Sequence, residues 1–294
     1  MAAQTSVVIV NWNGSEFLGP LIRSISSCKP HRIVVVDNAS TDRSREVLSG
    51  HPEVQVVWNT TNSGFGKGAN QGFALCETPY ILLLNADVEM LAGSMNRLQK
   101  FLEENPTAGV VAPQLMFPNG TIQRSCRSFP TLPKIFLYLS FLDRLFPTGY
   151  RLSKTMHERK GEVDQPMGAA LLLRKKALDE VGPFDERFFM YMEDVDLLER
   201  IKSAGYKVFL LPEARMIHYA GGSSNQEWER SQENYLQSVI RYFSKRSSPG
   251  LRMGLVRLTL SVALAVRAFF LLASGRWKQA GFYGKMVGSV FYLS

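Results

Sequence analysis

Short runs of apolar, mostly β-branched residues recur along the first third of the chain and predict buried strands. Strands buried on both faces of a parallel sheet have this continuous apolar character and this length. Four such runs lie at residues 6–10, 32–36, 54–58 and 80–84. Each is followed by a segment with helical patterning, at residues 16–27, 42–48, 65–76 and 92–104. The alternation predicts an α/β fold with an open, mostly parallel sheet and helices on both faces.

Beyond Pro113 the patterning is mixed. Residues 128–149 are rich in proline and aromatic residues and show no clean periodicity. The later elements are predicted as a strand, two helices and two strands, at residues 167–173, 174–181, 194–204, 206–211 and 214–219. Gly205 suits the position just after a helix. We therefore expect one domain over residues 1–225 and a helical tail over residues 226–294.

The tail is both basic and apolar. Residues 228–246 place apolar side chains on one helical face, and residues 255–274 are mostly apolar but contain Arg257 and Arg267. The stretch between these two arginines is too short to cross a bilayer. On one continuous helix Arg257, Arg267 and Lys278 would share a face. We expect an interfacial helix; a helix packed on the protein or on a second copy, and a transmembrane span, are the alternatives.

The net charge of +8 is concentrated in this tail. Residues 241–294 contain nine Lys or Arg and no Asp or Glu, so the rest of the chain is close to neutral. This distribution argues against nucleic-acid binding and suits an anionic membrane surface. A hydrophobic content of 45% is enough for a substantial core and excludes a mainly disordered chain.

The three cysteines, Cys28, Cys76 and Cys126, are odd in number and have no metal-ligand spacing. A disulfide framework or a zinc knuckle is therefore not expected, and a reducing compartment fits. The first residues lack the basic start and long apolar run of a signal peptide and are predicted to form the first strand. We expect a cytoplasmic protein held peripherally on the inner face of the cell membrane.

Polar residues at the carboxyl ends of the predicted strands are candidates for ligand binding, because open α/β sheets bind ligands there. Asp37 ends the second strand, where a carboxylate can accept a hydrogen bond from a base or a ribose hydroxyl; a turn role is the alternative. Asn85 and Asp87 follow the fourth strand. A carboxylate there can hold a hard divalent cation that also binds a diphosphate.

A glycine-rich segment, residues 62–70, leads into a helix and has glycines at positions 64, 66 and 68. Glycines permit close backbone approach, and a helix N-terminus favours an anion. The spacing matches neither a P-loop nor a dinucleotide-binding fingerprint. A plain turn is the alternative.

Two further candidates lie late in the sequence. Glu193 and Asp194 open a helix, and adjacent like charges raise a pKa, which suits a general base for a sugar hydroxyl. An acidic first turn that complements the helix dipole is the alternative. His218 comes near the end of the last predicted strand, where it is either a structural histidine or a metal ligand.

Taken together, these pieces resemble the family 2 glycosyltransferases of the GT-A fold. The resemblance covers roughly residues 5–225 and is strongest to the bacterial rhamnosyltransferase-like branch. Its parts follow the family's order, at residues 8–13, 36–42, 62–72, 84–87, 168–170, 193–197 and 218. Each motif alone is a weak signal, whereas the complete set in this order is specific to the family.

The resemblance implies a role for each matching position. Asp194 would be the catalytic base, and Gly168, Ala169 and Glu193 would support it or the acceptor. Asp87 and His218 would ligate Mg²⁺ or Mn²⁺. Asn85 stands where the family's metal motif has its first aspartate, which puts metal dependence in doubt. The nucleotide-sugar would be bound by Asn11, Asn13, Asp37, Asn38, Asn62, Lys67, Asn70 and Asn85.

The implied reaction is a single displacement that inverts the anomeric centre, with Lys67 and the metal offsetting charge on the diphosphate. Residues 1–112 would mainly bind the donor, and residues 113–225 would mainly serve acceptor binding and catalysis. The resemblance favours L-rhamnose from dTDP-L-rhamnose and a polyprenyl-linked glycan acceptor, with residues 128–149 as an acceptor lid. UDP-galactofuranose, UDP-N-acetylglucosamine and a homodimer stay open.

Three other functions compete with this interpretation. A sugar-nucleotide-binding scaffold without activity would not need Asp194 and His218. A nicotinamide-dependent oxidoreductase would need a glycine fingerprint in the first βα turn, where residues 11–15 read Asn-Trp-Asn-Gly-Ser. A nucleotidyltransferase would need a basic glycine-rich loop after the first strand, and the sequence has none there.

Overall fold

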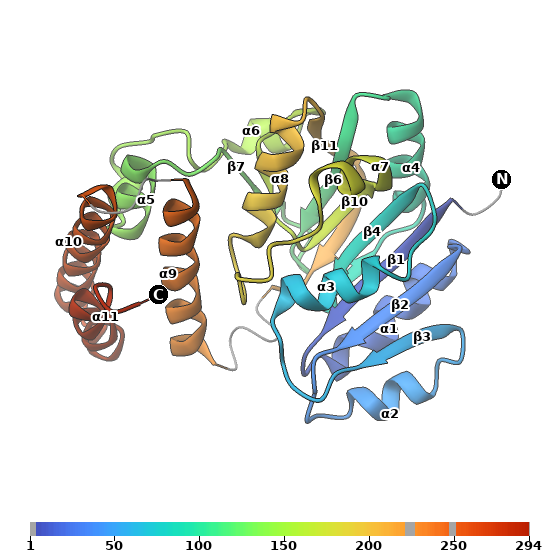
Figure 1. Ribbon diagram of the computed structural model, residues 1–294, viewed down its shortest axis with the longest axis horizontal. Helices are drawn as coiled ribbons and strands as arrows, with labels where there is room; N and C mark the ends of the chain where they lie inside the picture. Colours follow the sequence, from blue (N-terminus) through green and yellow to red (C-terminus); the bar gives the residue numbers. More distant parts are fainter. Residues whose placement is uncertain (1–3, 221–226, 247–250, 294) are drawn as a thin grey trace. The chain divides into compact units, whose positions relative to one another are not determined.

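The computed structural model describes residues 4–220, 227–246 and 251–293. The chain divides into two compact units, which are described separately below. Unit 1 comprises Met1–Arg127 and Leu152–Gln226, and unit 2 comprises Ser128–Arg151 and Glu227–Ser294. Figure 1 shows the elements of both.

Unit 1 is built on a sheet that has nine strands among the described residues. Its order is β3-β2-β1-β4-β10-β6-β11-β5, and β8 also pairs with β11. The pairs among β1, β2, β3 and β4 are parallel, as is β6 with β11, whereas β10 runs antiparallel to β4 and β6. The sheet is therefore mixed and mostly parallel, which confirms the predicted fold class. The strands are β1 (Thr5–Asn11), β2 (Arg32–Asp37), β3 (Val54–Trp58), β4 (Tyr80–Asn85), β5 (Val88–Met90), β6 (Ala108–Met116), β8 (Gly161–Glu162), β10 (Ala170–Arg174) and β11 (Lys207–His218).

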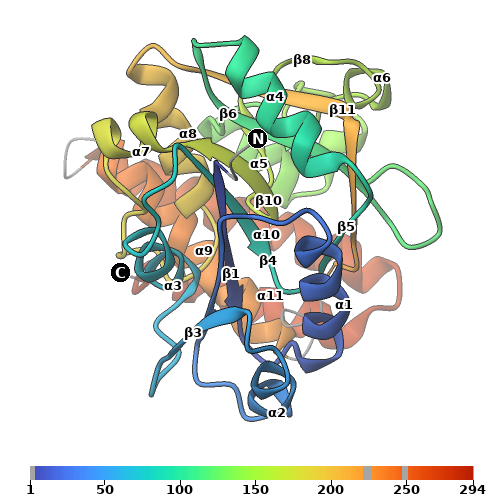
Figure 2. The same ribbon diagram turned by 90° about the vertical axis from the view of Figure 1, so that its right-hand side faces the viewer.

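Helices cover both faces of this sheet. The helices of unit 1 are α1 (Ser15–Ser26), α2 (Ser44–Ser49), α3 (Phe65–Phe73), α4 (Ser94–Glu104), α6 (Lys154–His157), α7 (Lys175–Val181) and α8 (Glu193–Ser203). Buried residues of α1 and α4, such as Leu21 and Leu98, share one core with Ile9 of β1. The other face of β1 meets α3, since a Cβ on Gly72 would lie 2.3 Å from Val8 Cγ1. Figure 2 shows α1 and α3 on opposite sides of β1.

The alternating strands and helices of the first third confirm the prediction, with ends shifted by a few residues. Two elements, β6 and β11, differ from the prediction at positions where glycine or proline interrupts the pattern. β6 contains Gly109 and Pro113, which break an apolar run, yet it is buried between β10 and β11. The two strands predicted at residues 206–211 and 214–219 are one strand, β11, with a register shift between Leu211 and Arg215. Pro212, which has no N–H to donate, lies at this irregularity.

Unit 2 is helical. It contains α5 (Leu132–Leu139), the 3₁₀ turn η1 (Leu142–Arg144), α9 (Trp228–Arg246), α10 (Leu251–Ala273) and α11 (Trp277–Ser289). A small two-stranded antiparallel sheet in unit 1 pairs β7 (Cys126–Arg127) with β9 (Gln165–Pro166). β7 precedes and β9 follows the segment that unit 2 takes from the middle of the chain. That segment, residues 128–151, was expected to belong to the first domain. It groups with the tail because α5 packs against α10.

The tail helices correct one expectation. Arg257, Arg267 and Lys278 do not share a helical face, because α10 ends at Ala273 and Gly275, with φ +74°, turns the chain into α11. Among the described residues, α10 is a helix long and apolar enough to cross a membrane, and 39% of its most apolar window is buried.

Candidate active site

A cleft opens in unit 1 at the carboxyl ends of the central strands. It contains about 650 Å³ of empty space, part of it open to solvent. Its polar lining comes from Asn38, Asn62, Asn85 and Asp87, which were all predicted site residues. The rest of the lining comes from Val10, Trp12, Gly14, Phe17, Gly64, Phe65, Ala86, Phe189 and Met190. A mixed aromatic and amide lining of this kind suits a base and sugar.

Asp87 and His218 meet at one end of this cleft. Asp87 follows β4, and its carbonyl accepts a hydrogen bond from Tyr219 N–H, the residue after β11. His218 Nε2 lies 3.3 Å from Asp87 Oδ1, and both side chains are largely buried. The other ring nitrogen, Nδ1, lies 2.9 Å from Gln123 Oε1. Gln123 thus orients the imidazole so that Nε2 faces the carboxylate.

This pair fits a divalent cation by its donor chemistry. One carboxylate oxygen and one imidazole nitrogen already face one another, and the second ring nitrogen is held by a neighbour, as in many metal-binding histidines. In the part of the chain that the structure describes, no group of three or more His, Cys, Asp or Glu side chains converges. The protein would therefore supply Asp87 and His218, and the remaining ligands of Mg²⁺ or Mn²⁺ would come from a diphosphate and water.

The amides of the cleft are held by the loop before α3. Asn38 Nδ2 donates to Gly64 O at 3.0 Å, and Gly64 N–H donates to Asn62 Oδ1 at 3.0 Å. Gly64 has φ +91°, and a Cβ there would lie 2.3 Å from Phe189 O. Only glycine allows this approach, so the predicted glycine-rich segment brings the N-terminus of α3 against the loop that ends at α8.

Three predicted nucleotide-binding residues do not line the cleft. Asn11 is fully buried, and its Nδ2 donates to Asp37 Oδ2 at 2.8 Å. Asp37 Oδ1 accepts the N–H of Ser40 at 2.9 Å. Asn13 Oδ1 accepts the N–H of Thr41 at 2.8 Å. These contacts fix the turns after β1 and β2, so a direct role for the three in binding a nucleoside stays a prediction.

Two other predicted residues lie on α3. Asn70 holds the loop before α8, since its Oδ1 accepts Phe184 N–H at 3.0 Å and its Nδ2 donates to Phe184 O at 2.9 Å. It does not line the cleft. Lys67 is exposed in the first turn of the helix. A role for either in binding the nucleotide stays a prediction.

Asp194, the predicted base, is the second residue of α8. Its Oδ2 accepts Gly168 N–H at 2.9 Å, and its Oδ1 accepts Val195 N–H at 2.8 Å. Burial raises the pKa of this carboxyl group above its usual value, although the two N–H donors and the positive charge of Arg127 oppose the rise. The carboxylate is thus fixed in position and more basic than an exposed aspartate, which suits proton abstraction.

Glu193 differs from its neighbour. It is buried, and its Oε2 has no hydrogen-bond partner among the described residues. Burial, and then the adjacent negative charge of Asp194, raise the pKa of Glu193 well above the ordinary value. Of the two neighbours, Asp194 has the N–H donors that stabilise a carboxylate, whereas Glu193 Oε2 has none among the described residues, which favours the charged form of Asp194.

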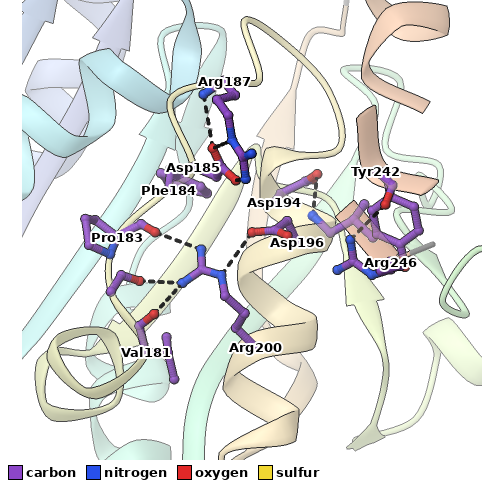
Figure 3. A network of polar contacts seen from close by, with 12 residues as sticks. Val181, Pro183, Phe184, Asp185, Arg187, Asp194, Asp196, Arg200, Tyr242 and Arg246 are labelled. Atoms are coloured by element: carbon purple, nitrogen blue, oxygen red, sulfur yellow. Dashed lines mark hydrogen bonds and ion pairs between the residues drawn. The ribbon is translucent and has the colours of Figure 1, made fainter. Parts of the chain in front are cut away.

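The loop between α7 and α8 is fastened by one arginine of α8 (Figure 3). Arg200 Nε donates to Asp196 Oδ2 at 2.9 Å. Its two terminal nitrogens donate to the carbonyls of Val181, Gly182 and Pro183, each at 2.7 Å. The loop fastened in this way carries Phe189 and Met190 to the cleft.

Backbone contacts join the base to the cleft. Gly168 N–H binds Asp194, and the next residue, Ala169, accepts the N–H of Asn85 through its carbonyl at 2.9 Å. A Cβ on Gly168 would lie 3.1 Å from Asp194 Oδ2, so the absence of a side chain permits this contact. Asn85 leads to Asp87 two residues later. These contacts link Asp194, through Gly168 and Ala169, to the end of β4, where Asp87 pairs with His218.

Several of these residues were not predicted from the sequence. Gln123 contacts His218 across 95 positions, and Arg127 acts on Asp194 from the short strand β7. Trp12 and Phe17 line the cleft. Trp12 follows a strand end, so the strand-end rule could have included it.

Comparison with known proteins agrees with this geometry. The chain is 28% identical over 286 residues to the N-acetylglucosaminyl-diphospho-decaprenol L-rhamnosyltransferase of Mycobacterium tuberculosis, covering 91% of this chain and 92% of that protein. It is 23% identical over 253 residues to the rhamnosyltransferase WbbL of Escherichia coli, covering 82% and 92%. The fold is similar to that of the mannosyltransferase PcManGT from Pyrobaculum calidifontis, solved with GDP-Man and Mn²⁺, with a TM-score of 0.59, 17% identity and coverage of 98% and 87%.

The family model of glycosyl transferase family 2 matches residues 6–182, which is more than half of the chain and includes β1 to β4 and Asp87. With the mixed sheet, the strand-end cleft and the fixed Asp194, this match identifies the enzyme class. The chain is a glycosyltransferase and belongs to glycosyl transferase family 2.

Proposed function

We propose that this protein transfers a hexosyl group from a nucleoside diphosphate to a hydroxyl group of a lipid-linked glycan, with inversion at the anomeric carbon. One observation carries the proposal. A fixed, half-buried carboxylate, Asp194, is linked by consecutive backbone contacts through Gly168 and Ala169 to the strand end that bears Asp87 and its partner His218. The proposed base and the proposed cation-binding pair are thus connected at the end of β4, next to the cleft that Asp87 lines.

In the proposed reaction, Asp194 takes the proton of the acceptor hydroxyl. The hydroxyl oxygen forms a bond to the anomeric carbon from one face, while the bond to the diphosphate oxygen breaks on the opposite face. The diphosphate leaves with the electron pair, and the proton remains on Asp194. The N–H groups of Gly168 and Val195 keep the carboxylate aimed throughout. The raised pKa of Asp194 makes it a better proton acceptor than an exposed aspartate.

Asp87 and His218 would hold a divalent cation, Mg²⁺ or Mn²⁺. The cation, when bound, supplies positive charge beside the leaving diphosphate. Asn85 contributes a neutral amide to the cleft in place of a second carboxylate, so fewer negative charges stand close to the diphosphate. Asn38 and Asn62 line the cleft, and their hydrogen bonds with Gly64 shape the part of it that would receive the base and sugar.

The favoured donor is dTDP-L-rhamnose, and the favoured acceptor is a polyprenyl diphosphate glycan. Both relatives named above are rhamnosyltransferases, and the name of the mycobacterial one describes a decaprenyl diphosphate acceptor. UDP-galactofuranose and UDP-N-acetylglucosamine are the alternative donors. A scaffold that binds a sugar nucleotide without turnover is the alternative function.

A binding panel with a transfer assay tests the proposal. Thermal shift and calorimetry would compare dTDP-L-rhamnose, UDP-galactofuranose and UDP-N-acetylglucosamine, each with Mn²⁺ and with a chelator. The expected result is stabilisation by dTDP-L-rhamnose that is weakened by the chelator, followed by transfer to a polyprenyl diphosphate glycan seen by mass spectrometry. Stabilisation by one of the UDP-sugars, with none by dTDP-L-rhamnose, would identify that UDP-sugar as the donor instead. Binding without transfer or donor hydrolysis would favour the scaffold.

A further inference from the structure

The outer face of α10 carries an apolar stripe. Leu251, Leu255, Leu258, Val262 and Phe269 are 92%, 56%, 54%, 46% and 65% exposed. Their spacing of four, three, four and seven residues places all five on one face of the helix. From the first to the last the stripe extends about 27 Å at a helical rise of about 1.5 Å per residue. A continuous exposed apolar surface of this length indicates an interaction site.

The opposite face of α10 is already used inside unit 2. Val256, Leu260, Leu264 and Leu271 are buried there. The helix packs against α5, α9 and α11. Ser261 Oγ donates to Val287 O of α11 at 2.8 Å. The stripe is therefore the outer side of a helix that unit 2 holds in place, and not part of a loose segment.

Two of the three arginines of α10, Arg257 and Arg267, point away from the stripe. Arg257 donates to the carbonyls of Val290 and Leu293, at 2.6 and 2.8 Å, where it satisfies the last carbonyls after α11. The Arg267 guanidinium lies 4.1 Å from the centre of the Phe141 ring and donates to Tyr283 Oη at 3.2 Å. No charge of these two residues interrupts the stripe.

Other basic residues of unit 2 are exposed. Arg252, Arg276, Lys278 and Lys285 are exposed on or beside α10 and α11, and residues 241–294 contain no Asp or Glu. Trp277 and Tyr292 are 71% and 90% exposed, and amphipathic aromatic side chains are enriched at membrane interfaces. An apolar stripe combined with exposed basic and amphipathic aromatic side chains is typical of interfacial helices.

We propose that unit 2 lies on an anionic lipid bilayer, with α10 in the plane of the surface and its apolar stripe in the boundary between headgroups and acyl chains. A second copy of the chain fits less well, because residues 241–294 of the two copies, which carry basic and no acidic side chains, would repel one another. A spanning α10 fits less well, because its buried face is packed in unit 2 and Arg257 and Arg267 would lie at hydrocarbon depth. The inference rests on unit 2 alone and does not depend on the proposed sugar donor.

Vesicle flotation of the full chain tests this inference. The chain is expected to float with vesicles that contain phosphatidylglycerol and to bind vesicles of phosphatidylcholine alone less well. Val262→Glu combined with Phe269→Glu is expected to lower binding about tenfold or more, because both charges enter the apolar boundary. Phe146→Glu is the control, since Phe146 is 61% exposed in unit 2 but lies outside α10. Vesicle binding by this variant is expected to stay unchanged.

Circular dichroism and light scattering of the same variants show whether they fold and whether the chain self-associates. Equal vesicle binding by the folded double variant and the control would overturn the proposal. So would binding that resists extraction at alkaline pH, which would show a spanning helix. Loss of a dimer in the double variant, with vesicle binding unchanged, would assign the stripe to a second copy. Donor binding is measured separately, so the vesicle-binding result can be interpreted even if the proposed function proves wrong.

Discussion

Replacing Arg200 tests whether the loop before the base is held as the structure indicates. Arg200→Met removes a guanidinium that binds Asp196 and three consecutive carbonyls, those of Val181, Gly182 and Pro183. The Asp196 side chain is fully buried, whereas that of Arg200 is 24% exposed. The variant therefore leaves a buried carboxylate without this cation.

Removing one partner of a buried ion pair typically costs about 3–5 kcal/mol. Because Arg200 is partly exposed, water can reach some of the freed groups, and we expect the lower end, about 3 kcal/mol. For a folding unit of this size, that loss lowers the melting temperature by about 6–12 °C. The double variant Asp196→Leu with Arg200→Met removes both charges and should recover most of the loss.

The matched control is Arg187→Met in the same loop. Arg187 pairs with Asp185 at 2.6 Å, but its side chain is 65% exposed, so its loss should cost about 1 kcal/mol or less. Thermal and urea unfolding of the four proteins provide the comparison. Equal destabilisation by Arg200→Met and Arg187→Met, or a double variant as unstable as the single one, would show that the buried Asp196–Arg200 pair does not hold this loop.

Three further predictions concern the site and its surroundings. Asp87→Ala should abolish the Mn²⁺ dependence of donor binding in calorimetry; a chelator effect equal to that of the unchanged protein would remove Asp87 as a ligand. Gly168→Ala places a Cβ 3.1 Å from Asp194 Oδ2, so transfer should fall about 100-fold with the fold retained, and unchanged transfer would contradict that contact. His157 accepts Cys126 N–H at Nε2, and burial lowers its pKa below the ordinary 6.5. The unfolded chain therefore takes up a proton first, and stability should fall as pH drops below about 6.5. His157→Gln should flatten this loss in unfolding measured from pH 7.5 to 5.5, and an unchanged slope would count against it.

The pattern of apolar residues predicted the first half of the fold well because its strands are buried on both faces. The runs that became β1, β2, β3 and β4 need no distant partner to be recognised. β6 escaped recognition because Gly109 and Pro113 interrupt it, and only pairing with β10 and β11 makes it a strand. The assignment of residues 128–151 to unit 2 depends on packing between α5 and α10, which no local pattern reveals.

The candidate site shows the same division. Strand ends and a helix start indicated Asp87, Asp194 and His218. In the structure Asp87 lines the cleft and pairs with His218, and backbone contacts through Gly168 and Ala169 connect Asp194 to the same strand end. The partners that hold them, Gln123 and Arg127, come from distant segments and have no local signature. Side chains at a strand end can also face the protein interior. The sequence alone does not distinguish Asn38, which lines the cleft, from Asn11 and Asp37, which do not.

The proposed role of Asp194 as the catalytic base is tested most directly by single-turnover kinetics of Asp194→Asn with saturating donor and acceptor. Asparagine keeps the size of the side chain and an acceptor for the Gly168 N–H but cannot take a proton at neutral pH. A general base at this position predicts a rate of transfer that is about 10²–10⁴-fold lower in the variant, with the donor dissociation constant unchanged. A rate within about threefold of the unchanged enzyme, given that a general base contributes about 10²-fold or more, would contradict it.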